Sequence, residues 1–109
     1  MKLSNVGVVI AQRELSLSTK AMVTVVIGKP EPFPDGNGCY CPYQVIGLGD
    51  QKVRYAAGED TAQALMLTLQ TIGAVLYASH EAKSGLLTWN GGTNLGFPEP
   101  DFVPGPPPP

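Results

Sequence analysis

Charged residues are scarce in this sequence, and their scarcity excludes one class of partner. Only 15% of the 109 residues are charged, whereas an average soluble domain has about 25%. The seven lysines and arginines are scattered along the chain and the net charge is −2, so no basic patch of the kind that holds a phosphate backbone can form. We therefore expect no binding to nucleic acid.

Long hydrophobic runs and cysteines suited to a disulfide are also missing. No apolar run approaches the roughly 18 residues of a membrane span, and Met1–Asn5 is not followed by the long apolar core of a signal peptide. On a strand, Cys39 and Cys41 would share one face with Cα atoms about 6.5 to 7 Å apart, a separation that strains a disulfide. Free thiols in a reducing compartment predict a cytoplasmic protein that does not associate with membranes.

The residue sets that catalysis and metal binding require are not found either. His80 is the single histidine, so both a Ser-His-Asp triad and a zinc site would depend on it. Cys39 and Cys41 lack the CxxC spacing of a zinc turn. The glycines of Gly47–Asp50 are followed by a strand pattern rather than a helix, which excludes a phosphate-binding loop. The sequence thus predicts no catalytic residue, no metal ligand and no cofactor.

What the chain does contain is the pattern of two β-hairpins. β-Branched residues and alternation predict strands at Val8–Leu17 and Ala21–Gly28, and the second is apolar enough for a central place in a sheet. A second hairpin is predicted within Tyr40–Ala57, with its turn at Gly49–Asp50. The proline-rich segment Lys29–Gly38 lies between the hairpins, and it predicts an exposed loop that contributes no strand.

One long amphipathic helix follows the second hairpin. Asp60 and Gln63 form the pattern of a capping box, and Gly85 lies just beyond the last helical turn. A helix that ran unbroken to Lys83 would be about 35 Å long, which is longer than such a small domain, so it should break early or overhang. Gly73 in its interior predicts a close approach of the helix backbone to the sheet.

These elements together predict an α+β fold with two layers. A mostly antiparallel sheet of four or five strands is expected to carry the long helix on one face, with Leu86–Trp89 as a short fifth strand. The single packed domain is predicted to span residues 1–98. The remaining residues, 99–109, are proline-rich and predict an extended tail, in which Pro104–Pro107 is the one PxxP-type segment.

Several motifs together resemble a known family. They read YCPYQVIGLGD, VRYAAGEDTAQAL, IGAVLYASHEA, LTW and LGFP. As a set, they resemble a family of small bacterial proteins described only as a domain of unknown function, and the resemblance covers Arg13 to Pro98. It implies a bacterial, cytosolic protein, and it brings no catalytic residues to this chain.

With no catalytic set, the sequence predicts a protein that works by binding. Arg54 is expected to project from the solvent face of the sheet, between inward-pointing Val53 and Tyr55. The other candidate contact residues are Lys52, Gln44, Arg13, Tyr40 and Trp89. Trp89 has a second interpretation as a lid over the end of the core.

The leading hypothesis for function is a non-catalytic bacterial protein that binds another protein. A concrete form of it is an inhibitor of the immunity or antitoxin type, whose partner is a toxin. Two alternatives stay open. One is a small-ligand-binding or enzymatic domain with its site between the 29–38 loop and the sheet. The other is a homo-oligomeric structural module joined through an exposed strand edge.

Overall fold

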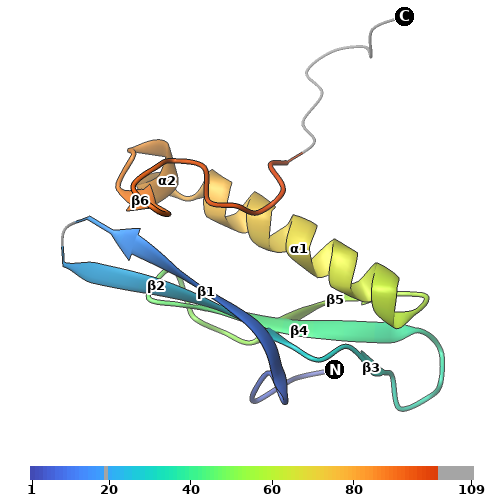
Figure 1. Ribbon diagram of the computed structural model, residues 1–109. Coiled ribbons are helices and arrows are strands. Elements are labelled where there is room, and N and C mark those ends of the chain that lie inside the picture. The colour runs from blue at the N-terminus through green and yellow to red at the C-terminus, as the bar shows by residue number, and fades with distance from the viewer. Residues whose placement is uncertain (19, 101–109) are drawn as a thin grey trace, which may run out of the picture.

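The computed structural model describes residues 1–18 and 20–100, which form a sheet and one long helix laid across it (Figure 1). The elements in chain order are β1 (Val9–Leu17), β2 (Ala21–Gly28), β3 (Glu31–Pro32), β4 (Cys39–Ile46), β5 (Arg54–Gly58), α1 (Thr61–Ala78), α2 (His80–Lys83) and β6 (Leu87–Thr88). This arrangement is the two-layer α+β fold that the sequence predicts, with β6 as the short strand near Trp89.

All strand pairings are antiparallel, and both predicted hairpins are present. β2 lies between β1 and β4, which confirms the central place that its apolar sequence predicts. β5 pairs with the other edge of β4, and the two-residue strand β6 pairs with the end of β1. The sheet therefore has two long inner strands, β2 and β4, under the helix.

The prediction that Lys29–Gly38 contributes no strand is wrong. Glu31 pairs with Tyr40 and Pro32 pairs with Cys39, which forms the short strand β3. The backbone N–H of Phe33 donates to the carbonyl of Gly38 at 3.0 Å and closes the turn. A proline fits here because β3 pairs with β4 alone, and an edge strand can place a residue without an N–H on its free side.

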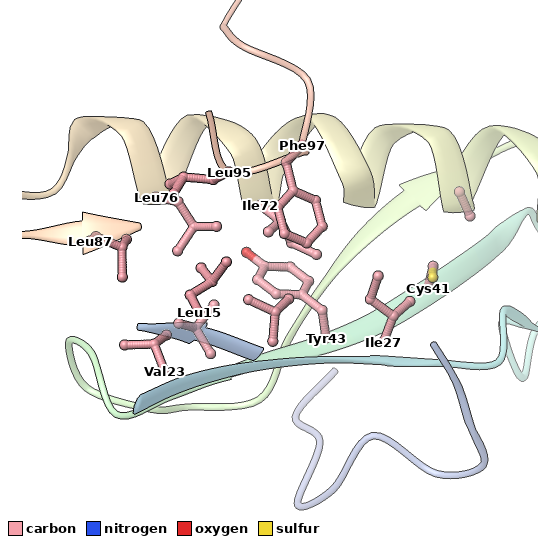
Figure 2. Packing of buried hydrophobic residues seen from close by; sticks show 13 residues of the cluster. Leu15, Val23, Ile27, Cys41, Tyr43, Ile72, Leu76, Leu87, Leu95 and Phe97 are labelled. Atoms are coloured by element: carbon pink, nitrogen blue, oxygen red, sulfur yellow. The ribbon is translucent and has the colours of Figure 1, made fainter. Parts of the chain in front are cut away.

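The strand register separates a helix-facing side of the sheet from an opposite face. In the antiparallel pairs, Leu15 opposes Val23, and Ile27 opposes Tyr43. Because directly opposed residues share a face, the helix-facing side chains are Leu15, Val23, Val25, Ile27, Tyr43 and Val45. Figure 2 shows four of them, Leu15, Val23, Ile27 and Tyr43, on the side of the sheet that faces Ile72 and Leu76 of α1. Leu87, Leu95 and Phe97 close the core from the C-terminal segment.

Helix α1 begins and ends through side-chain caps. The carboxylate of Asp60 accepts from the backbone N–H of Gln63 at 2.8 Å, and the Gln63 side chain accepts from the N–H of Glu59 at 2.7 Å. The helix then breaks at Ser79, whose hydroxyl donates to the carbonyl of Leu76 and accepts from the N–H of Ala82. The N-cap at Asp60 and the early break are both confirmed, whereas the Gln63 side chain reaches the residue before the N-cap rather than Asp60 itself.

Gly73 has a different role from the predicted one. It is buried, but a Cβ atom at this position would meet the backbone carbonyl of Pro98 rather than the sheet. The C-terminal segment passes directly over the helix here, and only a residue without a side chain leaves room for it. The sequence correctly predicts a close approach at Gly73, but the prediction that the sheet is the approaching segment is wrong.

The N-terminal residues lie against the opposite face of the sheet. Val6 is buried, and its carbonyl is so close to Gly28 that no side chain would fit there. The backbone N–H of Lys29 donates to the carbonyl of Val8 at 2.7 Å. The part of this face around Gly28, at the end of β2, is therefore covered by the chain itself.

Helix α1 is long and apolar enough to pass for a membrane span by length and composition. In the structure it packs on the sheet with Ala64, Ile72 and Leu76 in the core. The tail from residue 101 onward, including Pro104–Pro107, lies outside the described residues, so the boundary at Pro98 stays a prediction.

Candidate functional site

A groove of about 580 Å³ opens between the C-terminal end of α1 and the loop of residues 47–53. β4 pairs with β5 only through Cys39–Tyr43, so beyond Tyr43 the edge of β4 has no neighbour. The loop turns outward at this point, and the helix passes above it. The gap between loop, helix and strand edge is the groove.

The floor of the groove is apolar and its rim is charged. Tyr43 and Val45 of β4, Leu48 of the loop and Val75 of α1 line the apolar part. The polar and charged lining residues are Asp50, Gln51, Lys52, Arg54, Ser79 and Glu81. Both signs of charge are present around a hydrophobic centre.

Hydrogen bonds within the 47–53 loop fix its shape. The side-chain oxygen of Gln51 accepts from the backbone N–H of Gly47 at 2.9 Å, and the side chain of Gln44 donates to the Gln51 carbonyl at 2.9 Å. Gln51 itself has a φ of 59°, a conformation unusual for a residue with a side chain. The loop is therefore a preformed wall of the groove, and Gln44 supports it from outside.

Arg54 and Asp50 form an ion pair at the rim. Their side chains approach to 2.6 Å, and each is about half exposed, at 54% and 50%. The backbone N–H of Lys52 donates to Asp50 at 3.1 Å. This hydrogen bond, together with the positive charge of Arg54, holds the pKa of Asp50 below its ordinary value. Asp50 is thus a stable anion that orients Arg54.

Tyr43 brings a hydroxyl group to the floor of the groove. The residue is only 4% exposed, and its burial raises the pKa of the phenol, while the charge of Arg54 opposes that shift. Among the described residues no protein group hydrogen-bonds to this hydroxyl, and it is not one of the fully buried polar atoms. A bound group can therefore use it as a donor or an acceptor.

The predicted contact residues do not share one face. Arg54 directly opposes Tyr43, which places it on the helix-facing side, whereas Tyr55 opposes Pro42 on the opposite face. The prediction of Arg54 on the solvent face with an inward Tyr55 is therefore wrong. Of the candidates, Arg54 and Lys52 line the groove, and Gln44 holds the loop.

Arg13 and Trp89 lie together away from the groove. The Arg13 guanidinium stacks on Trp89 and donates to the Leu95 carbonyl at 3.2 Å. Trp89 is partly buried and packs against the core, which confirms its interpretation as a lid. The binding roles proposed for Arg13 and Trp89 stay predictions.

Tyr40 belongs to an aromatic cluster on the opposite face of the sheet. Its ring centroid lies 5.2 Å from that of Phe33 and 5.8 Å from that of Tyr55. A hollow of about 310 Å³ beside it is lined by residues that include Leu3, Lys29 and Glu31. The sequence does not predict that Phe33, Tyr40 and Tyr55 meet, because their meeting depends on β3 and β5 both pairing with β4.

The cysteines and the histidine lie outside the groove. Cys41 is buried, and this burial raises the pKa of its thiol, which donates to the Gly28 carbonyl at 3.5 Å. His80 is exposed, and its nearest polar partner is the Ser84 hydroxyl at 3.4 Å. Within residues 1–18 and 20–100, no three His, Cys, Asp or Glu side chains come close enough to hold a metal ion.

Comparisons with curated proteins and with solved structures give no match. One family model matches, over residues 11–99, which is nearly the whole of the packed domain. That range includes the motifs between Arg13 and Pro98 on which the resemblance rested, and it also includes the groove. The chain therefore belongs to the family described as Domain of unknown function (DUF6968).

Proposed function

We propose that the protein is a non-catalytic binding protein that engages a partner protein through the groove between α1 and the 47–53 loop. One observation carries the proposal: an apolar floor enclosed by a rim with both signs of charge. Protein interfaces have this anatomy, with a hydrophobic centre that supplies affinity and a polar rim that excludes water.

The dimensions of the groove suit one anchor side chain from a partner. Its volume of about 580 Å³ lies within the range of about 300 to 1,000 Å³ that binding pockets occupy. Leu48, Val45 and Val75 can desolvate an aliphatic or aromatic side chain. Lys52 and Glu81 can then pair with opposite charges on either side of it, which fixes the orientation of the partner.

The concrete form of the proposal is an inhibitor of the immunity or antitoxin type in the bacterial cytoplasm. The small size, the net charge of −2 and the low content of charged residues support it, and the free thiols of Cys39 and Cys41 suit a reducing compartment. In this form the anchor side chain belongs to the toxin.

A small molecule is the second candidate for the groove. The observation that favours it is the free hydroxyl of Tyr43 at the apolar floor, near the cation of Arg54. A ligand with an apolar body, one hydrogen-bonding group and one anionic group would match these features. This site differs from the predicted one between the 29–38 loop and the sheet.

Affinity capture from the native host tests the protein partner. The tagged protein is compared with Lys52→Glu in the groove and with Lys29→Glu, which makes the same charge change at the other end of the sheet. We expect a protein that the wild type and Lys29→Glu retain and that Lys52→Glu loses. If every retained protein binds all three baits equally, the groove is not the binding site.

A thermal-shift screen of small molecules tests the second candidate. A compound that stabilises the wild type should lose most of its effect on Tyr43→Phe, which removes only the hydroxyl. If the stabilisation is the same for both proteins, the ligand does not use the floor of the groove.

A further inference from the structure

Three aromatic rings form a partly exposed cluster on the face of the sheet that α1 does not cover. Phe33 follows β3, Tyr40 belongs to β4 and Tyr55 belongs to β5, and the ring centroids lie 5.2, 5.8 and 5.9 Å apart. All three residues are partly exposed. In the described part of the chain, none of them is among the residues that form the core or pack against it. The cluster therefore offers apolar surface that the core under α1 does not use.

An apolar hollow adjoins the cluster at Tyr40. Its volume is about 310 Å³, and its other apolar lining residues are Leu3, Val6, Val8 and Pro42. Val8 is 68% exposed, although it is a large aliphatic residue. Because Tyr40 belongs to both the cluster and the hollow, the rings and the recess form one continuous surface.

The charges around this surface favour neither an acidic nor a basic partner. Lys29 and Glu31 line the hollow with opposite signs, and their side chains approach to 3.5 Å. Asp35 lies in the turn between β3 and β4, and Lys2 lines a second hollow beside Tyr55. These four charges sum to zero. A partner segment with apolar and aromatic groups and little charge therefore fits best.

The chain itself contains a segment of this composition. Residues 101–109 read DFVPGPPPP and lie outside the described residues. Five of the last six residues are proline, and Asp101 is the single charged residue of the segment. A polyproline helix has no internal hydrogen bonds, so its carbonyl oxygens are free to accept from a donor. Grooves lined by aromatic rings bind such helices, because the helix is already formed before it binds.

We propose that the aromatic cluster of one copy binds segment 101–109 of a second copy. Pro104–Pro107 pack against the three rings, and the hydroxyls of Tyr40 and Tyr55 donate to carbonyl oxygens of the segment. Phe102 enters the hollow beside Tyr40. It precedes Pro104 by two residues, or about 6 Å along a polyproline helix, so both contacts can form at once.

A second copy is required because the segment begins on the helix side of its own domain. Pro100 lines a hollow together with Gln70 and Ala74 of α1, where the described chain has passed over the helix (Figure 1). The cluster lies on the other side of the sheet. A helix with its side chains is about 10 Å across, whereas the step from Pro100 to Phe102 spans at most about 7 Å. Phe102 therefore cannot reach the hollow of its own copy.

This contact leaves one cluster and one segment free in every pair. Two different surfaces meet, so no twofold axis closes the contact, and association continues from copy to copy. The surface is separate from the groove between α1 and the 47–53 loop.

Sedimentation equilibrium of the full chain, run from micromolar to millimolar concentration, tests the contact. We expect the average mass to rise from that of the 11.5 kDa chain to more than twice this value. Tyr55→Thr removes one ring and keeps a residue suited to a strand. Pro104→Ser/Pro106→Ser/Pro107→Ser removes the polyproline helix. Either variant should raise the dissociation constant about tenfold or more.

A mixture of the two variants distinguishes this contact from any other. Tyr55→Thr keeps an intact segment, and the triple proline variant keeps an intact cluster. At a concentration where neither variant associates alone, the mixture should form pairs of twice the mass of one chain and nothing larger, because each pair has a single intact contact.

Ile46→Thr is the matched control for Tyr55→Thr. Ile46 is 40% exposed and lies on the same face of β4 as Tyr40, six residues or about 20 Å away. We expect it to leave the association unchanged. Lys52→Glu in the groove should also leave it unchanged, so this proposal and the proposed function can fail independently.

Three outcomes would overturn the contact. The first is a mass of one chain at every concentration. The second is an association that Ile46→Thr weakens as much as Tyr55→Thr does, or that the triple proline variant leaves unchanged. The third is a mixture of the two variants that stays at the mass of one chain under conditions in which the wild type associates. Thermal unfolding of each variant, followed by circular dichroism, checks that its fold is retained.

Discussion

The guanidinium carbon of Arg13 lies 3.9 Å from the ring centroid of Trp89. Phe97 is also close, at 4.8 Å, so the cation lies against two aromatic rings, and its Nη1 donates to the carbonyl of Leu95. Arg13 belongs to β1, whereas the other three residues belong to the C-terminal segment. One side chain therefore fastens the last described part of the chain to the sheet.

The same contact explains Gly96. Its φ is 77°, and a Cβ atom there would overlap both the Trp89 ring and the Arg13 side chain. Leu95 and Phe97 on either side are buried in the core. A glycine is needed between these two core residues because Arg13 and Trp89 occupy the space that a side chain at position 96 would need.

Arg13→Lys tests the stack. Lysine keeps the charge but lacks the planar group that stacks on Trp89 and hydrogen-bonds to Leu95. We expect a loss of about 1 to 2 kcal/mol in the free energy of unfolding, measured by urea denaturation. Gln12→Ala, at an exposed neighbouring position, is the control and should change stability by less than about 0.5 kcal/mol. Equal stability of Arg13→Lys and the wild type would show that the stack contributes nothing.

Gly73→Ala tests the passage of the C-terminal segment over α1. In an exposed helix the change stabilises by about 1 kcal/mol, but here the new methyl group would meet the Pro98 carbonyl. We expect a net destabilisation of about 1 to 3 kcal/mol, because the segment must move away. Thermal unfolding followed by circular dichroism measures the effect. Gln70→Ala, on the exposed side of the same helix, is the control and should be neutral or slightly stabilising. A stabilised Gly73→Ala protein would contradict the close approach.

Local patterns in the sequence are sufficient for the long strands and for the start of the helix, but not for the two-residue strand β3. The capping residues Asp60 and Gln63 act within one turn of each other, and β2 is a run of mostly β-branched residues, so neither depends on the rest of the chain. Such short-range signals mark where α1 begins, whereas the break before Lys83 is expected from size, because an unbroken helix of about 35 Å would be longer than so small a domain.

The faces of β5 and the groove depend on contacts between distant residues. Arg54 and Tyr55 are both long and partly polar, and Ala56 and Ala57 are equally small, so the alternation does not mark an inner side. Pairing with β4 decides which residues of β5 face the helix. Arg54 directly opposes Tyr43, so both side chains lie on the helix-facing side. The groove arises because the pairing of β4 with β5 ends at Tyr43. The need for a glycine at position 73 likewise depends on a distant residue, Pro98, which lies 25 residues further along the chain.

The two cysteines should differ in their reaction with iodoacetamide. Cys41 is buried and its burial raises the pKa of the thiol, so little thiolate is available at neutral pH. Cys39 is partly exposed. We expect mass spectrometry of the folded protein to find one modification, at Cys39, and a second at Cys41 only after unfolding in urea. Modification of Cys41 first, without denaturant, would show that the core around Cys41 and Gly28 opens readily.

Because of Asp50, the free energy of unfolding should fall at low pH. Its pKa in the folded protein is lowered from an ordinary value of 3.8, chiefly by the hydrogen bond from Lys52 and by the nearby Arg54. A carboxyl group whose pKa is lower in the folded state contributes stability above its unfolded pKa, and loses that contribution as the pH falls through the folded pKa.

Asp50→Asn isolates this contribution. At neutral pH the variant lacks the ion pair with Arg54, so we expect it to be less stable than the wild type. The difference in unfolding midpoint between the two proteins should be constant above the ordinary pKa of 3.8, and it should shrink as the pH falls below this value and through the lower pKa of the folded protein. Glu31→Gln, which removes an exposed ion pair with Lys29, is the control. If the difference between Asp50→Asn and the wild type stays constant across this range, Asp50 does not anchor the loop through its charge, and the rim of the groove is held by the Gln51 hydrogen bonds alone.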